Sequence, residues 1–337
     1  MQDRILLGHG SGGKLSSELI HKIFVKKFKN DWLDRQTDAA LLNIEAGLLS
    51  FTTDSFVVDP IFFPGGDIGK IAIAGTVNDL AVSGAIPLFL SCSVIIEEGL
   101  LISDLERIVD SMAEEASKAG VKIVTGDTKV VDKGKCDKIF INTSGIGKLQ
   151  KELESISTGE NISISDKIII NGSIADHGMA VLSARNEMNL SAEINSDCAS
   201  LNHLIKSVLE EGCQIKFMRD ATRGGLATVI SELADRVKMG INLYENKIPV
   251  HENVRGICEI LGFDPLYVAN EGKVVMVVSD KDAEKTIDIL KHNPLGKDSA
   301  IIGEITTDYK GKAWLTTEIG GKRIIDTLAG EQLPRIC

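Results

Sequence analysis

The chain has 337 residues, of which 43% are hydrophobic and 25% charged, and its formal net charge is −11. This length predicts two domains with ordinary cores, and the acidic balance excludes nucleic acid and anionic membrane surfaces as expected partners, since both attract basic faces. The N-terminus lacks a signal-peptide core, and no apolar run reaches the roughly 18 residues of a membrane span, which predicts a cytoplasmic protein. The six cysteines form no CxxC pair, so neither a zinc site nor a disulfide framework is expected.

The first motif is the glycine-rich segment GHGSGGK at residues 8–14. Its spacing fits a P-loop, but Leu15 stands where a metal-binding Ser or Thr is required, and too few residues precede it to form the usual strand. We therefore expect a glycine loop followed by a helix over residues 16–28. Such a loop, which carries Lys14, could fold over a phosphate.

Residues 51–87 are the stretch around which the rest of the chain is organised. A buried strand is predicted over residues 48–51, ending at polar residues that include Asp54. Pro64-Gly65-Gly66 then breaks the chain before Asp67, a good N-cap for the following helix. A glycine-rich approach to a helix N-terminus suits an anion.

Within that helix Ile68, Ala72, Gly75 and Asp79 form one stripe of small residues that ends in a carboxylate beside the apolar face. A carboxylate at such a position is costly unless it is paired or binds a metal ion. Singly, these acids are more simply explained as turn, cap and helix residues. Together with the glycines they favour a Mg²⁺-phosphate site.

The first half continues with a strand over residues 88–96 and a helix that begins at a capping box of Ser103 and Glu106 and ends at Gly120. A strand over 121–125 leads into the loop GDTK, which would present Asp127 and Lys129. An ordinary surface turn explains this loop equally well. A strand over 139–143 follows.

The polar segment at residues 151–161 is the expected hinge, and the pattern of strands and helices then restarts. Residues 218–225, MRDATRGG, form a second glycine-rich approach to a helix, with an acid and two arginines suited to phosphate. The elements expected in this half are strands over 167–171, 241–245 and 273–278, helices over 197–211, 226–237, 254–261 and 282–292, and two closing strands. Each half is predicted to be a layered α/β sandwich, with domains at residues 1–155 and 156–327.

Residues 328–337, LAGEQLPRIC, form a tail outside regular structure. Ten residues at roughly 3.5 Å each span about 35 Å, enough to visit a distant site. A thiol on such an arm, at Cys337, is typical of a carrier. A frayed end with an incidental cysteine is the simpler alternative.

The motifs together resemble the HypE family of hydrogenase maturation factors, within the superfamily of aminoimidazole ribonucleotide synthetase and selenophosphate synthetase. The resemblance spans nearly the whole chain, and the PRIC ending distinguishes this family from its superfamily. The family has proline where this chain has Ala221, which predicts a less rigid loop there. The matching segments are FPGGDIGK, GTVNDLA, VTGDTKVV, RDATRGGLA, ANEGK and PRIC.

The resemblance implies a homodimer that binds ATP and Mg²⁺. The carbamoyltransferase HypF would load a carbamoyl group on Cys337, and this chain would dehydrate it to a thiocyanate with ATP. The cyano group would then pass to iron on a HypC–HypD scaffold complex during assembly of nickel-iron hydrogenase.

The resemblance also implies roles for individual residues. The expected catalytic residues are Cys337, Glu271 and Lys129, with Glu271 as the base that takes protons from nitrogen. The expected nucleotide-binding residues are Lys14, Asp38, Asp67, Asn78, Arg219 and Arg223, and the expected metal ligands, direct or through water, are Asp54, Asp79, Asp127 and Asp220. Two alternatives remain: an ATP-dependent enzyme of the same superfamily acting on a free small molecule, and a non-catalytic thiol carrier.

Overall fold

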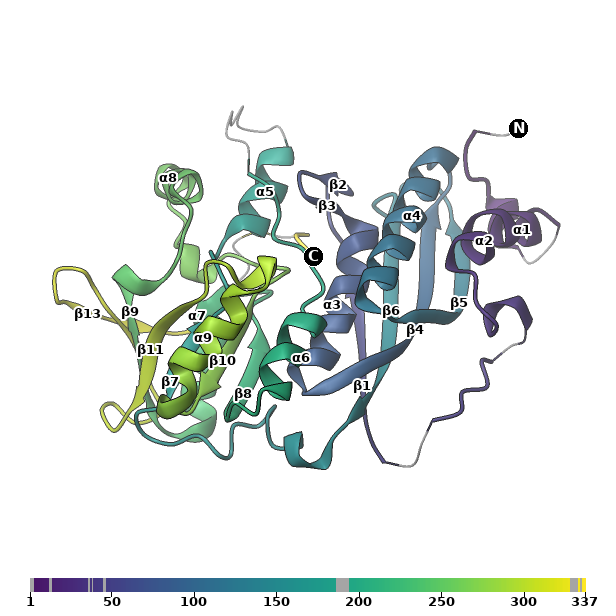
Figure 1. The fold of residues 1–337 in the computed structure, drawn as a ribbon. Helices are drawn as coiled ribbons and strands as arrows, with labels where there is room; N and C mark the ends of the chain where they lie inside the picture. Colours follow the sequence, from purple (N-terminus) through teal and green to yellow (C-terminus); the bar gives the residue numbers. More distant parts are fainter. Residues whose placement is uncertain are drawn as a thin grey trace.

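The fold has two large sheets that stand side by side, each covered by helices, and a small two-stranded sheet (Figure 1). The computed structural model describes residues 3–11, 14–35, 37, 39–44, 47–185, 194–327, 333 and 335–337. Within these residues no helix is both long and apolar enough to cross a membrane.

The first sheet has four strands in the order β1-β6-β4-β5, with β4 and β5 parallel and the other neighbours antiparallel. Helices α3 and α4 cover one face, and the glycine loop and first helices pack near β5 (Figure 1). The elements of this half are α1 (Lys14–Leu19), the π-helical η2 (Ile20–Val25), α2 (Lys26–Phe28), β1 (Leu48–Phe56), β2 (Phe62–Phe63), β3 (Gly66–Asp67), α3 (Ile68–Val82), β4 (Ala85–Glu97), α4 (Ile102–Ala119), β5 (Lys122–Val131) and β6 (Ile139–Leu149).

Helix α3 lies at the centre of the molecule and is buried on nearly all sides. As predicted, Asp67 is its N-cap, and the carboxylate accepts hydrogen bonds from the backbone N–H groups of Gly69 and Lys70. The small residues let neighbours approach closely: a Cβ on Gly75 would stand 2.9 Å from the ring of Phe56 on β1. The predicted stripe of small residues therefore lets β1 pack closely against α3.

Three predictions for the first half were wrong in detail. Strand β1 is longer than expected and exposed along one side, where Phe51 is 70% accessible. Strand β5 runs straight through GDTK, because this segment pairs in parallel with β4, so Asp127 lies in a strand. Helix α4 begins one residue before Ser103, with Leu101 at the N-cap, so the capping box does not form, whereas Gly120 does end the helix in the left-handed conformation.

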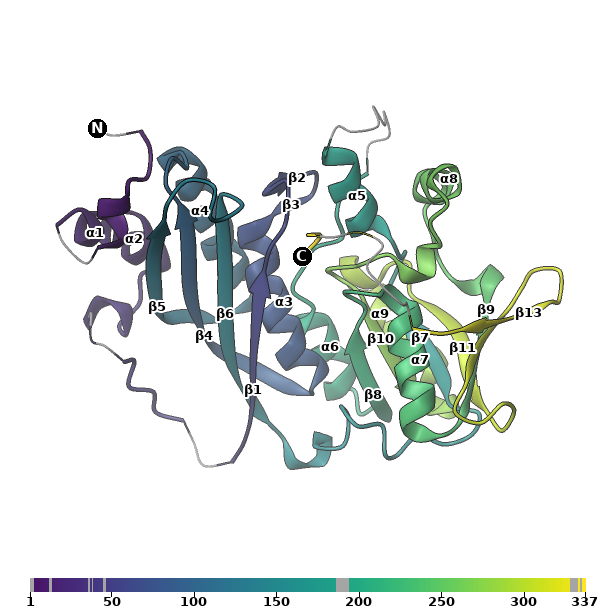
Figure 2. The same cartoon turned by 180° about the vertical axis from the view of Figure 1, so that it is seen from behind.

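The second sheet has seven strands in the order β13-β12-β9-β11-β7-β10-β8. Helix α7 packs on one face, and α6 and α9 pack on the other, which gives three layers (Figure 2). The elements of this half are β7 (Lys167–Ile170), α5 (Asp176–Ala184), α6 (Asn202–Glu210), β8 (Ile215–Asp220), α7 (Gly225–Val237), β9 (Gly240–Tyr244), α8 (Glu252–Leu261), β10 (Val274–Val278), α9 (Ala283–Lys291), β11 (Ala300–Thr306), β12 (Ala313–Thr316) and β13 (Lys322–Ile325).

The layered α/β architecture was predicted correctly, but α5 and β8 were missed, and three strands close the chain where two were expected. Strand β8 is the edge strand beside α3. A continuous apolar cluster joins the halves, since Ala81 and Val82 of α3 and Ile156 pack with residues of α6, α9 and β10. The end of the chain lies between α3 and α5 in both views (Figures 1 and 2).

The contact between Gly75 and Phe56 predicts the effect of adding one methyl group. Gly75→Ala would force β1 away from α3 and lower the free energy of unfolding by about 1–3 kcal/mol, the usual cost of overpacking a core. Urea denaturation measures this change.

A matched control is Gly256→Ala in α8, because a Cβ there meets nothing within 4 Å. Alanine favours a helix interior over glycine by about 0.5–1 kcal/mol, so this variant should be as stable as the parent or more stable. Equal destabilisation by both substitutions would contradict the packing argument.

Candidate active site between the two sheets

The first pair of carboxylates belongs to β1 and α3. Side chains alternate along β1, so Thr52, Asp54 and Phe56 share the face that packs on α3. The hydroxyl of Thr52 donates a 2.7 Å hydrogen bond to Oδ2 of Asp79. Burial is the main cause that raises the pKa of both aspartates.

Asp220 brings a third carboxylate to this pair from the end of β8. Burial raises its pKa to about 7, and the negative charges of Asp79 and Asp54 add to this effect. Like charges brought together at a buried site need a cation or a proton among them. Asp54 and Asp79 of the first half and Asp220 of the second half thus form one site between the two sheets, which we call the junction.

The thiol of Cys337 lies in the same junction. It is hydrogen-bonded to the buried carboxylate of Glu271, whose pKa is raised well above its ordinary value chiefly by burial and by the charge of Asp197. Arg223 is also hydrogen-bonded to Cys337, and its pKa is raised mainly by the charge there. A sulfur, a carboxylate and a guanidinium therefore meet beside the three aspartates.

Glu271 is held through its backbone. The amide of Asn78 on α3 donates to the carbonyl oxygens of Ala199, at 3.0 Å, and Glu271, at 3.4 Å. Asp197 accepts a 3.0 Å hydrogen bond from the N–H of Glu271 and forms a 2.9 Å ion pair with Lys273. In this structure Asn78, expected at the nucleotide, positions the loop that carries Glu271.

The other expected nucleotide-binding residues are spread more widely. Arg219 forms an ion pair with Glu232 and contributes positive charge near Asp79 and Asp220. Asp67 caps α3.

Lys14 lies farther out, at the start of α1. Its side chain is 90% exposed and lies 4.0 Å from Glu18. Asp38 is outside the described residues.

Asp127 and Lys129 are not brought into this junction. They are paired in register with Ser93 and Ile95 on β4, which face away from α3, and they form a 2.9 Å ion pair with each other. The side chain of Lys129 lowers the pKa of Asp127. Both residues thus lie on the open face of the first sheet, at the edge opposite β1.

Asp54, Asp79 and Asp220 are the carboxylates that could bind a cation. Among the described residues no three His, Cys, Asp or Glu side chains already form a metal-binding group. Mg²⁺ in phosphate sites takes one or two carboxylates, with water and phosphate oxygens as its other ligands. Asp54, Asp79 and Asp220 fit that requirement, because their mutual repulsion is relieved by a cation.

Sequence reasoning missed several residues that contact the tail or the carboxylates. Thr52 was treated only as a strand end, although its spacing from Asp54 places both on one face. His177 and Arg185 were missed because α5 was not predicted, and a buried histidine beside glycine was the available signal.

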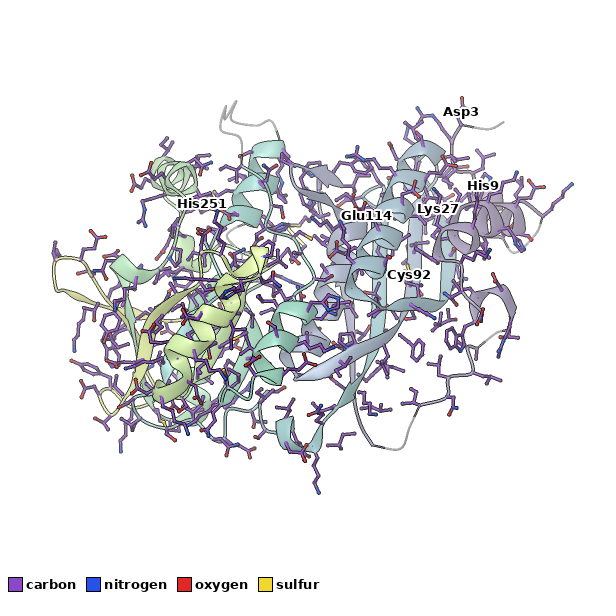
Figure 3. The ribbon with its side chains drawn as sticks, viewed as in Figure 1. Asp3, His9, Lys27, Cys92, Glu114 and His251 are labelled. Carbon is purple, nitrogen blue, oxygen red and sulfur yellow. The ribbon has the colours of Figure 1, made fainter. Side chains whose placement is uncertain are left out.

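The environment of Cys337 differs from that of an inert core thiol such as Cys92. Cys92, labelled in Figure 3, lies on β4 inside the first half, and burial alone raises its pKa to about 12. Cys337 is surrounded by Glu271, Arg223 and Asp54, which all act on its charge. The tail cysteine therefore lies at the border of the hydrophobic core, where burial raises its pKa most and charged side chains also act on it.

Comparison with known proteins shows which family the chain belongs to. The profile of the AIR synthase related protein N-terminal domain matches residues 36–149, and that of the C-terminal domain matches residues 164–315. The carbamoyl dehydratase HypE of Bradyrhizobium diazoefficiens is 46% identical over 98% of this chain and 95% of its own length. The chain belongs to the HypE family.

Other HypE proteins agree. The carbamoyl dehydratase HypE of Escherichia coli is 46% identical, over 99% of this chain and 100% of its own. A crystal structure of the hydrogenase maturation protein HypE in complex with ATP is 45% identical and superposes with a TM-score of 0.94 over 98% of this chain and 99% of its own. The fold and its family membership, both expected from the motifs, are confirmed.

Two further structures bear on interactions and on fold. A HypE–HypF complex contains a chain that is 49% identical to this one, with a TM-score of 0.79 over 92% of this chain and 99% of its own. Thiamine monophosphate kinase from Aquifex aeolicus is 18% identical, with a TM-score of 0.59 over 92% of this chain and 99% of its own, and shares the fold.

The charge at the junction predicts how Asp220→Asn changes stability. The pKa of Asp220 is 3.8 as a reference value and about 7 in the folded protein. A raised folded pKa means that the native state loses stability as pH rises through this interval. At pH 8 with a chelator present, Asp220→Asn should therefore raise the thermal midpoint, by about 2 °C or more.

Asp127→Asn is the matched control, because Lys129 lowers the pKa of Asp127 and the substitution removes a favourable exposed pair. It should leave the midpoint unchanged or slightly lower. Differential scanning calorimetry decides between these results, and a lower midpoint for Asp220→Asn would contradict the repulsion inferred at the junction.

Proposed function

We propose that this chain is an ATP-dependent carbamoyl dehydratase that acts on a carbamoyl group carried by its own Cys337. The observation that carries the proposal is the hydrogen bond between the Cys337 thiol and the buried Glu271 carboxylate, beside Arg223 and three aspartates. Similar proteins named carbamoyl dehydratase, and one solved with ATP, support the assignment.

The reaction needs a leaving group and a base. Transfer of the γ-phosphoryl group of ATP to the carbamoyl oxygen lets that oxygen leave as phosphate when its bond to carbon breaks. The nitrogen gives up both protons, and a carbon–nitrogen triple bond forms, leaving a thiocyanate on sulfur. Glu271 is the proposed proton acceptor, because burial raises its pKa and makes it a stronger base.

The remaining residues of the junction organise charge. Asp54, Asp79 and Asp220 would hold Mg²⁺ directly or through water, which would offset phosphate charge during transfer. Arg223 would stabilise negative charge on the departing oxygen, since it already contacts Cys337.

The docked thiol is unsuited to being loaded. Burial and Glu271 raise the pKa of Cys337, so it remains a weakly nucleophilic thiol at this position. Loading by HypF would therefore occur with the tail elsewhere, and a HypC–HypD complex would receive the cyano group after the tail leaves again. The known HypE–HypF complex supports the first of these partners.

A homodimer would explain the position of Asp127 and Lys129. The open face of the first sheet exposes Phe51 and Ile95, an apolar surface suited to a second copy. Across such an interface these two residues would approach the partner's nucleotide. This supports their expected roles despite their distance from the junction within one chain.

The test of the activity is the mass of the C-terminal peptide after carbamoyl loading. Adding ATP and Mg²⁺ should remove the mass of one water from the carbamoylated peptide, whereas Cys337→Ser should never gain the carbamoyl group. A thiol carrier would keep its full mass with ATP. An enzyme acting on a free small molecule would turn over normally with Cys337→Ser.

The test of the base is Glu271→Gln, which keeps the shape of the side chain and removes its basicity. ATP binding should persist, and dehydration should fall by about 10²-fold or more, the usual contribution of a general base. Asp197→Asn is not a neutral comparison because it touches the same loop, so Glu284→Gln, at an exposed position in the first turn of α9, serves as the control. Dehydration at the parent rate by Glu271→Gln would remove Glu271 from this role.

A further inference from the structure

The end of the tail is bound along its main chain by a segment that follows β1. The N–H of Val57 donates a 3.2 Å hydrogen bond to a main-chain carboxylate oxygen of Cys337, and the N–H of Asp59 donates a 3.2 Å bond to the carbonyl oxygen of Arg335. The tail thus lies beside residues 57–59 as an added strand does in peptide recognition.

Two side chains from α5 and its C-cap complete this binding. Nε2 of His177 lies 2.7 Å from the carbonyl oxygen of Ile336. Nη2 of Arg185 donates a 2.8 Å hydrogen bond to the carbonyl oxygen of Arg335, and its Nε donates another to the carbonyl oxygen of Asp59. A main-chain oxygen of each of the last three residues is therefore bound by a donor from the body of the protein.

The tautomer of His177 is fixed by its surroundings. A carbonyl oxygen only accepts, so Nε2 must carry the hydrogen, and Nδ1 of the neutral ring must accept. Nδ1 lies 2.8 Å from the hydroxyl of Ser196, which itself accepts a 3.1 Å hydrogen bond from the N–H of Cys198. Burial lowers the pKa of His177, which keeps the ring neutral. Ser196 therefore orients the donor toward the tail.

The side chains of the tail contribute unequally. Ile336 is 4% exposed and packs into the core of the first half. Arg335 is half exposed and ion-pairs with Asp137 at 2.8 Å. Ile336 supplies the apolar anchor, whereas the hydrogen bonds to the main-chain oxygens fix the position of the tail beside residues 57–59.

We propose that His177, oriented by Ser196, and Arg185 form a latch that holds the tail by its main-chain carbonyls and keeps the sulfur of Cys337 beside Glu271. They are positioning residues, since they contact the tail and not the reacting group. The latch deepens the proposed function and rests on it for the role of the docked position, while docking itself is measured without any reaction.

The first test is alkylation of Cys337 by iodoacetamide in the full chain without nucleotide, followed by the mass of the C-terminal peptide. His177→Leu removes the donor and should speed alkylation about fivefold or more, because a hydrogen bond to a buried carbonyl is lost. His177→Gln retains a donor at a similar reach and should alkylate at close to the parent rate.

Matched controls exist elsewhere in the chain. Nε2 of His203 lies 3.0 Å from the carbonyl oxygen of Lys118, away from the tail, so His203→Leu should leave alkylation unchanged. Arg185→Gln should speed alkylation, whereas Arg236→Gln, which loses a 2.9 Å bond to the carbonyl oxygen of Ser157, should not.

The second test is the rate of thiocyanate formation from carbamoylated protein, which should fall in His177→Leu by a factor similar to the gain in alkylation and recover in His177→Gln. Unchanged alkylation in His177→Leu would overturn the latch. Equal exposure of the buried Cys198 and Cys258 would also overturn it, by showing a general loss of structure. If the parent forms no thiocyanate, the dehydratase proposal fails, and alkylation still decides the latch.

Discussion

Repulsion among buried carboxylates is the constraint on which this structure depends. Burial raises the pKa values of Asp54, Asp79 and Asp220; the charge of Asp54 adds to the rise at Asp79, and the charges of both add to the rise at Asp220. Protein interiors hold such charge only when it is neutralised or bound to a cation. This is the physical basis for proposing that Asp54, Asp79 and Asp220 bind a cation.

The site also depends on how the two halves pack against each other. Helix α3 and β1 supply Asp79 and Asp54, while β8 and the loop before β10 supply Asp220 and Glu271. Neither half contains the site alone, so a small displacement between them would separate the carboxylates. The shared apolar cluster around Ala81 and Ile156, and the bonds of Asn78 to the Glu271 loop, oppose that displacement.

The tail adds a second requirement, because its sulfur must be protected at one stage and reachable at another. In the docked position the thiol is buried, and its raised pKa makes it unreactive toward an electrophile. Residues 335–337 are held by hydrogen bonds to their main-chain oxygens and by the buried side chain of Ile336.

The sequence by itself determined the layered α/β class, the cap at Asp67, the small-residue stripe of α3 and the motifs that identify the family, because these depend on local spacing. It also marked Asp54, Asp79, Asp220, Glu271 and Cys337 as residues of interest, although their roles remain predictions. Only the tertiary structure decided which of them meet. Strand pairing placed Asp54 toward α3 and turned Asp127 to the opposite face, and the register of a strand is set by partners distant in the chain. The latch residues His177 and Arg185 could not be predicted from the sequence either, because they and the end of the tail become neighbours only on folding.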